Sequence, residues 1–255
     1  MFSRYALVER SEPAYHWRVP LSDPHPDRAL PGWLRQALIV TGKDLRIEAR
    51  TGEVTVTSAF FALLVVILSS LSFSGGPMNQ RQVAAGTLWL TIAFAAVLAL
   101  SRNWQREREE SAFLGMLALP LSRSAIFFGK FLGLSIFLGI IEVMVIPLIA
   151  LLFAIELSQT GLALISVALV ATPGIAATGT LFGSMTVRTR ARDLVLAVVL
   201  FPLLAPTLLA AVVATRELFG GVPIGELRDY LVLMGLFDFI FLVGGLTLFG
   251  LLVDE

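Results

Sequence analysis

Long apolar runs separated by short polar segments dominate the pattern of this 255-residue chain. A helix that crosses a bilayer needs about 20 mostly apolar residues. Six runs approach or exceed that length, at about residues 54–73, 83–100, 126–155, 161–187, 194–215 and 230–253. The pattern therefore predicts an all-α polytopic membrane protein with six transmembrane helices. The third run is several turns longer than a hydrocarbon core of ~30 Å, so we expect it to tilt, to protrude or to break at Pro147.

Residues 33–50, directly before the first run, have a different pattern. Apolar or small side chains recur at helical spacing from Leu34 to Ala49, and most of the basic side chains lie off this stripe. A basic amphipathic helix with Trp33 at one end is typical of the membrane interface. An ordinary surface helix is the alternative, and the position directly before a span favours the interface.

The first 32 residues contain five prolines and no apolar core of the kind found in a signal peptide. We expect residues 1–32 to form an extended or disordered cytoplasmic tail, with a regulatory arm as the alternative, and residues 33–255 to form one transmembrane domain. The composition agrees, since 56% of the residues are hydrophobic and only 15% are charged. The formal net charge of zero gives no indication of a nucleic-acid partner, and the absence of cysteine excludes disulfides and thiolate metal sites.

The distribution of Lys and Arg predicts the orientation in the membrane. With the N-terminus in the cytoplasm, only Arg81, Arg216 and Arg228 of the 19 basic residues fall outside. Because cytoplasmic loops carry an excess of Lys and Arg, we expect this orientation. An even number of spans then puts the C-terminus in the cytoplasm as well.

The stretch "QREREESAFLGMLALPLSRSAIFFGK" at 105–130 lies on the predicted cytoplasmic side. It begins with charges, continues as an apolar piece too short to cross a bilayer, and turns at Pro120. We expect a charged extension of the second span, a short apolar helix, and Ser124 as the cap of the third span. The apolar helix must bury its face against the membrane surface or in a groove of another protein.

Several kinds of chemistry are missing from the sequence. Neither Gly42-Lys43 nor Gly129-Lys130 has the preceding glycine of a nucleotide-binding loop. The two histidines, His16 and His25, both lie in the tail. This argues against an intramembrane protease, a zinc site or a histidine ligand for haem at membrane depth. We therefore expect no enzymatic activity in this chain.

Two acidic residues lie within predicted spans, Glu142 in the third and Asp238 in the sixth. Charges at this depth cost a few kcal/mol and usually face the protein interior. Counting from the span ends places both carboxyl groups ~18 Å from the cytoplasmic side, so we expect them to share a layer. A functional role and a structural one, in which each acid is protonated or bonds a neighbouring helix, both remain open.

Small residues at a spacing of four suggest close helix packing at two places. These are Gly129-x-x-x-Gly133 and Gly179-x-x-x-Gly183. The Pro173-Gly174 pair in the fourth run predicts a kink.

Taken in order, these segments resemble the CcmB family, the permease subunit of the ABC-type haem exporter of cytochrome c maturation. The resemblance covers roughly residues 33–253. It rests on "KDLRIEAR", on "REREESAFLGMLALPLSRSAIFFGK", on Glu142 within "IIEVMVIPLIALLF", on "GTLFGSMTVRTRARDLVLAVVLFPLLAPTLLA" and on "LFDFIFL". The tail is a departure from the family pattern.

The resemblance implies an ABC-2-type exporter fold in the bacterial inner membrane, with a leading interfacial helix and two permease copies. It implies a CcmA-like ATPase that holds ATP, a CcmC-like haem-handling subunit, a CcmD-like small subunit and a CcmE-like periplasmic haem chaperone. This chain would then bind no cofactor directly. A permease of another ABC-2 exporter, for polysaccharide, lipid or drug, and a scaffold that transports nothing are the alternatives.

The resemblance also implies that residues from about 105 to 121 form a coupling helix. Its apolar face would enter a groove of the ATPase, and the charges before it would fix the docking register. The residues concerned are Arg106, Glu107, Arg108, Glu109, Glu110, Phe113, Leu114 and Leu117.

Overall fold

A computed structural model of the chain describes residues 31–72, 76–109, 121–186 and 192–254. These residues form helices and connecting turns, and no strand occurs among them. The helices are α1 (Trp33–Thr51), α2 (Glu53–Ser72), α3 (Pro77–Glu109), α5 (Arg123–Leu152), α6 (Leu157–Thr186), α7 (Arg192–Phe219) and α8 (Arg228–Asp254), with a 3₁₀ turn η1 (Ile224–Leu227) before α8.

Six of these helices, α2, α3, α5, α6, α7 and α8, are long and apolar enough to cross a membrane. This confirms the predicted all-α polytopic class. The predicted spans lie within or close to the observed helices, and the largest difference is at α3, which extends well beyond the predicted 83–100 at both ends. Some of the predictions concern residues outside the described ranges. These are the predicted tail up to residue 30 and four residues of the predicted coupling helix, Glu110, Phe113, Leu114 and Leu117.

Local chemistry explains how α5 begins and corrects one prediction. Ser122, not Ser124, caps the helix, because its side chain accepts a hydrogen bond from the backbone N–H of Ala125. The hydroxyl of Ser124 instead accepts a hydrogen bond from Trp33 Nε1 at 2.9 Å. The helix also continues through Pro147 to Leu152, so it does not break there. Helix α6 likewise continues through Pro173.

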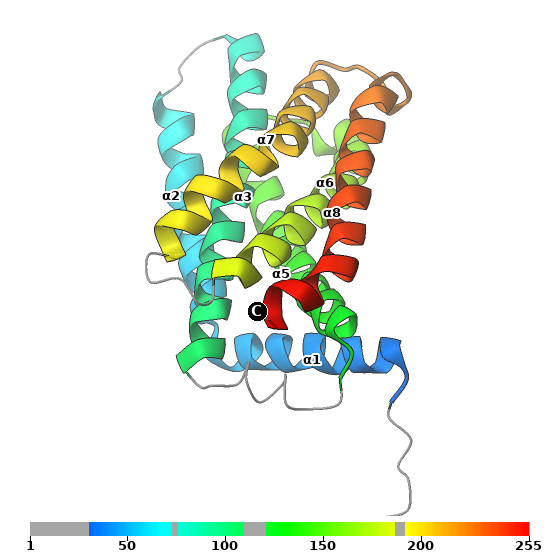
Figure 1. Ribbon diagram of the computed structural model, residues 1–255. Helices are drawn as coiled ribbons and strands as arrows, with labels where there is room; N and C mark the ends of the chain where they lie inside the picture. The colour runs from blue at the N-terminus through cyan, green and yellow to red at the C-terminus, as the bar shows by residue number, and fades with distance from the viewer. Residues whose placement is uncertain (1–30, 73–75, 110–120, 187–191, 255) are drawn as a thin grey trace, which may run out of the picture. The chain divides into compact units, whose positions relative to one another are not determined.

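Helix α1 runs crosswise at one end of the bundle, where α3 ends and α5 begins (Figure 1). It turns into α2 at Gly52, which adopts a left-handed φ of 61° that glycine permits without strain. The face of α1 toward the bundle consists of Gln36, Ala37, Val40 and Thr41. Leu34 and Leu38 point away from the bundle and are 62% and 59% exposed. The first part of the predicted stripe is therefore exposed, whereas Thr41, further along the stripe, packs against the bundle.

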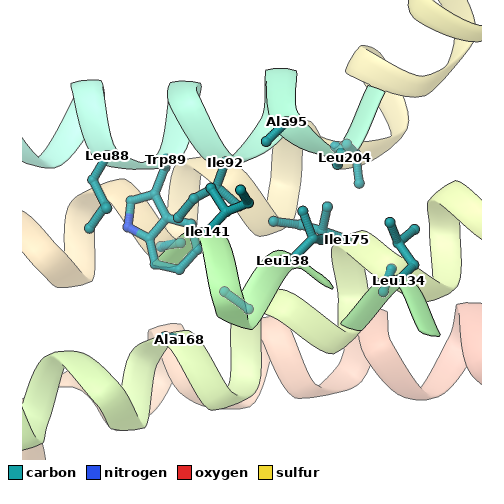
Figure 2. Close-up of a cluster of buried hydrophobic side chains, with 14 of the residues drawn as sticks. Leu88, Trp89, Ile92, Ala95, Leu134, Leu138, Ile141, Ala168, Ile175 and Leu204 are labelled. Carbon is teal, nitrogen blue, oxygen red and sulfur yellow. The ribbon is translucent and has the colours of Figure 1, made fainter. Parts of the chain in front are cut away.

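The core of the bundle is formed by side chains from α3, α5, α6 and α7 (Figure 2). Trp89 and Ile92 of α3 lie near Leu138 and Ile141 of α5, and all four are buried. Trp89 also donates a buried hydrogen bond of 2.8 Å from Nε1 to the hydroxyl of Thr215 on α7. This core holds in place the ends of α3 and α5 that carry the site described next.

Candidate functional site

The segment between α3 and α5 was predicted to contact a partner protein, and its two flanks are described. Arg106 and Glu107 lie near the end of α3, and Arg108 and Glu109 form its last residues. On the other flank, Ser122 caps α5, which begins at Arg123. The backbone N–H of Ser122 donates to Gln36 Oε1 at 2.9 Å, which ties this flank to α1.

Both flanks meet in a buried group of charges, which we call the lysine–carboxylate cluster: Lys43, Asp44, Glu107 and Lys130. Lys130 Nζ pairs with Glu107 Oε1 and lies 2.9 Å from Asp44 Oδ2. Lys43 Nζ pairs with the same Glu107 oxygen and lies 3.2 Å from Asp44 Oδ1. Two cations thus alternate with two anions contributed by α1, α3 and α5.

Two members of the cluster are almost completely shielded from solvent, while Lys43 is 33% exposed. The side chains of Lys130 and Glu107 are only 1% and 3% exposed. Lys130 also donates to Asn103 Oδ1 at 3.2 Å and lies 5.5 Å from the ring centre of Trp104. Buried charges are tolerated when they are paired and hydrogen-bonded, and removing one partner is costly. The cluster therefore favours one relative position of the three helices.

The charges in the cluster shift one another's protonation. Burial alone would raise the pKa of Asp44, but the adjacent ammonium groups of Lys130 and Lys43 outweigh burial and hold this pKa below its ordinary value. Burial alone would lower the pKa of Lys43, but Asp44 and Glu107 together outweigh burial and raise it. Both groups therefore remain charged throughout the physiological pH range.

The position of Glu107 bears on the predicted docking register. This side chain was expected among the charges that face an ATPase, yet its carboxylate is enclosed by lysines of its own chain. Arg106 is more accessible and lies 3.5 Å from Glu53 of α2. Glu107 therefore connects the end of α3 to α1 and to α5, and its contact with an ATPase stays a prediction.

Close packing of α1 on α5 sets the geometry of the cluster. A Cβ atom on Gly129 would lie 2.6 Å from the carbonyl oxygen of Ala37 and 2.7 Å from Cβ of Val40. The hydroxyl of Thr41 donates to the carbonyl oxygen of Gly129 at 2.9 Å. The predicted small-residue face at Gly129 thus receives α1, and the short approach brings Asp44 within reach of Lys130.

The second predicted small-residue face packs on α3. A Cβ atom on Gly179 would lie 2.6 Å from Leu100, and one on Gly183 would overlap the indole of Trp104. Because Trp104 also lies beneath Lys130, the packing of α6 reaches the lysine–carboxylate cluster through this ring.

Glu142 lies on α5 and is buried. The hydroxyl of Thr172 on α6 donates a hydrogen bond to its Oε1. This contact gives the acid one polar partner within a region that is otherwise apolar.

Asp238 lies on α8 and approaches α6 at a different place. Its Oδ1 lies directly against the backbone of Gly174, where any side chain would overlap it. The same oxygen is buried and has no hydrogen-bond partner among the described residues. Glycine at this position is therefore what allows the carboxyl group to approach α6.

The two acids contact α6 at nearby positions on different sides of the helix. Glu142 meets Thr172 and Asp238 meets Gly174, which are ~3 Å apart along the helix axis and about 200° apart around it. Helix α6 therefore stands between the two contacts, and a common depth of the carboxyl groups in the membrane stays a prediction. Each acid meets a different pair of helices.

Sequence reasoning missed the lysine–carboxylate cluster. Lys130 lies seven residues inside α5 and is flanked by apolar residues. A lysine in such a position needs an anionic partner, which is a signal that could have been used. Nothing in the sequence identifies Asp44 or Glu107 as that partner. Among the described residues, no three His, Cys, Asp or Glu side chains are placed to hold a metal ion.

Comparison with known proteins gives a consistent result. The family model described as CcmB protein matches residues 35–244. Heme exporter protein B of Rhodobacter capsulatus is 30% identical over 169 residues, which cover 66% of this chain and 76% of the relative. Heme exporter protein B of Bradyrhizobium diazoefficiens is 26% identical over 70% of this chain and 80% of the relative, and that of Pseudomonas aeruginosa is 24% identical over 68% and 77%. The match to the family extends from α1 into α8, and on this evidence the chain belongs to the CcmB family.

Proposed function

We propose that this chain is the membrane permease subunit of an ABC-type haem exporter that serves cytochrome c maturation. The observation that carries the proposal is the family match over residues 35–244, supported by relatives named heme exporter protein B. The chain resides in the bacterial inner membrane with both termini in the cytoplasm. The excess of Lys and Arg in the segments at the α1 end of the bundle supports this orientation.

The chain works with separate subunits that hold the nucleotide and the haem. A CcmA-like ATPase binds and hydrolyses ATP, and this chain has no enzymatic activity and binds no cofactor directly. A CcmC-like membrane subunit, a CcmD-like small subunit and a CcmE-like periplasmic chaperone handle the haem. A second copy of this chain completes the transporter.

The ATPase docks on the segment from about 105 to 121. The apolar side chains of Phe113, Leu114 and Leu117 enter a groove of the ATPase, where each contributes ~1.5–3 kcal/mol of burial before association costs. Arg106 lies beside the docked subunit. Glu107 has a different role in this proposal, because its buried contacts with Lys43 and Lys130 support a function in holding both flanks of the segment.

This arrangement gives a route for movement. A displacement of the segment by the ATPase pulls on the end of α3 and the start of α5. Since the lysine–carboxylate cluster joins both helices to α1, the three helices move together. Glu142 and Asp238 lie further along the bundle, at the contacts of α5 and α8 with α6.

The test replaces Leu114 and Leu117 with Asp in the full-length chain. The segment lies between two spans, so the permease should still insert into the membrane. A tagged CcmA-like ATPase is purified from solubilised membranes, and the permease is detected by blotting. We expect its recovery to fall at least tenfold and the yield of cytochrome c to fall with it, because charge in an apolar groove is strongly unfavourable.

The matched control replaces the same two leucines with methionine, which retains an apolar side chain of similar volume. This control should keep both ATPase recovery and cytochrome c yield near the wild-type values. Undiminished recovery with the two Asp substitutions would reject the docking assignment. Normal cytochrome c yield in a strain that lacks the chain altogether would reject the proposed function itself.

A further inference from the structure

A cavity of about 360 Å³ lies between α1, α2, α3 and α5, next to the lysine–carboxylate cluster. Its walls are mostly apolar and include Leu45, Ala49, Val54, Leu134 and Phe137. The volume falls within the range of ordinary ligand sites. Nothing in the proposed transport cycle uses this cavity.

The cavity also has polar walls that carry charges of both signs. Glu48 Oε1 accepts hydrogen bonds of 2.7 Å from the backbone N–H and from the hydroxyl of Thr55. In the part of the chain that the structure describes, no basic side chain pairs with Glu48. Its carboxylate therefore has an uncompensated negative charge.

The positive charge comes from Arg106, which lines the cavity together with Asn103. Arg106 shares the carboxylate of Glu53 with Arg102, at 3.5 Å and 3.3 Å respectively. Two guanidinium groups thus face one carboxylate, which leaves one positive charge in excess. The cavity is therefore lined by one carboxylate that has no basic partner among the described residues, that of Glu48, and by one guanidinium group, that of Arg106, which shares its carboxylate partner.

Two apolar side chains link the cavity to the lipid-facing surface. Ile136 and Ile140 line the cavity and are 43% and 45% exposed. They lie one turn apart on α5, a helix long and apolar enough to span the membrane. A hydrocarbon chain at the surface of α5 can therefore reach the cavity without crossing a polar barrier.

We propose that this cavity binds one membrane phospholipid whose headgroup carries both a phosphate and a primary ammonium, as phosphatidylethanolamine does. The phosphate pairs with Arg106 and accepts a hydrogen bond from the side-chain amide of Asn103. The ammonium pairs with Glu48. One acyl chain lies along Leu134 and Phe137 and leaves past the two exposed isoleucines.

The charges favour this headgroup over others. Phosphatidylglycerol provides the phosphate, but it leaves the Glu48 carboxylate beside a second anion. Phosphatidylcholine carries a cation that has no N–H to donate. The lipid bound here holds α1 against α2 and α5, because it contacts all three helices.

The test measures lipid retention by native mass spectrometry on the full-length chain in detergent. The protein is stripped of lipid and then titrated with phosphatidylethanolamine or phosphatidylglycerol. We expect the wild type to retain one phosphatidylethanolamine at least tenfold more tightly than phosphatidylglycerol. Glu48→Gln should remove most of this preference, and Glu226→Gln, at an exposed site on η1, should leave it unchanged.

A second pair of variants tests the cavity itself. Ala49 is exposed and lines the cavity, so Ala49→Phe should fill it with little effect on folding, and Ala49→Ser serves as the control for the position. We expect Ala49→Phe to weaken phosphatidylethanolamine binding at least tenfold and Ala49→Ser to preserve it. Equal retention of the two lipids by the wild type, or undiminished retention by Ala49→Phe, would overturn the proposal. Neither result depends on haem export or on the ATPase.

Discussion

Lys130 Nζ lies 2.9 Å from Asp44 Oδ2, and this contact joins a helix that crosses the membrane to the helix that lies across the end of the bundle. The lysine is almost completely buried, so the contact has little competition from water. The same ammonium group also pairs with Glu107 at the end of α3. One side chain therefore connects three helices.

The first prediction concerns this lysine. Among the described residues, Lys130→Ala leaves Asp44 and Glu107 with Lys43 as their only basic partner, and it should lower the free energy of unfolding by about 3–5 kcal/mol. Thermal unfolding of the purified protein in detergent measures the change. Arg216→Ala, which removes an exposed ion pair with Glu217, is the control and should cost at most about 1 kcal/mol. Similar losses from both variants would show that the cluster adds no more than a surface pair.

The second prediction concerns pH. Asp44 has an ordinary pKa of 3.8 that is lowered in the folded protein, so its contribution to stability is complete above that value. The contribution is lost as the pH falls through the folded pKa. The difference in stability between the wild type and Asp44→Asn should therefore be constant at neutral pH and shrink below about pH 4. A difference that stays constant from pH 7 to pH 3 would contradict a lowered pKa.

Lys43 supplies the third prediction, with the opposite sign. Its pKa is raised above the ordinary value of 10.5, so its contribution is complete below that pH and is lost as the pH rises through the folded pKa. The stability difference between the wild type and Lys43→Met should shrink only above about pH 10.5. Arg35→Met on the same helix provides the comparison, because Arg35 is exposed and is not a member of the lysine–carboxylate cluster.

The fourth prediction uses two glycines of α5. Gly129→Ala pushes a methyl group against the backbone of Ala37 and should destabilise the protein by about 1–3 kcal/mol through displacement of α1. Gly139→Ala is the matched control, since a Cβ there meets nothing within 4 Å and alanine is the better helix former. The free energy of unfolding of both variants is measured under identical conditions. Equal stability of the two would show that α1 does not need the close approach.

The fifth prediction concerns the two intramembrane acids. Because α6 separates them, Glu142→Gln and Asp238→Asn should act independently, and their effects on cytochrome c yield should multiply in the double variant. Yield is measured in a strain that carries only the variant chain, with its membrane level checked by blotting. A double variant no worse than the worse single one would indicate that both acids serve one site. Normal yield from the double variant would exclude a functional role for both.

The sequence predicts the spans well because apolar length is a property of each segment alone. It also predicts the crosswise helix, since the stripe containing Leu34 and Leu38 is visible in the order of residues. The cap of α5 was placed at Ser124 when Ser122 fills that role, because both serines satisfy the same local rule. The backbone distinguishes them, because it is extended at Ser122 and already helical at Ser124.

The lysine–carboxylate cluster could not be predicted in the same way. Its members come from three helices, and Lys43 and Glu107 are separated by 64 positions in the chain. Pairing Asp44 with Lys130 likewise requires the crossing point of α1 and α5, which depends on the absence of a side chain at Gly129. Counting residues predicts a common depth for Glu142 and Asp238. Their placement on opposite sides of α6 depends on the rotation of that helix, which counting does not provide.

The bond from Thr41 to the carbonyl oxygen of Gly129 spans 88 positions, and this separation has a consequence for biosynthesis. A ribosome adding about 5–20 residues per second needs about 4–18 s to pass from one residue to the other. During that interval α1 is complete, but its partner on α5 has not been made. The amphipathic helix α1 must therefore remain at the membrane surface while α2 and α3 are inserted, and it is fixed in place only after α5 has been made.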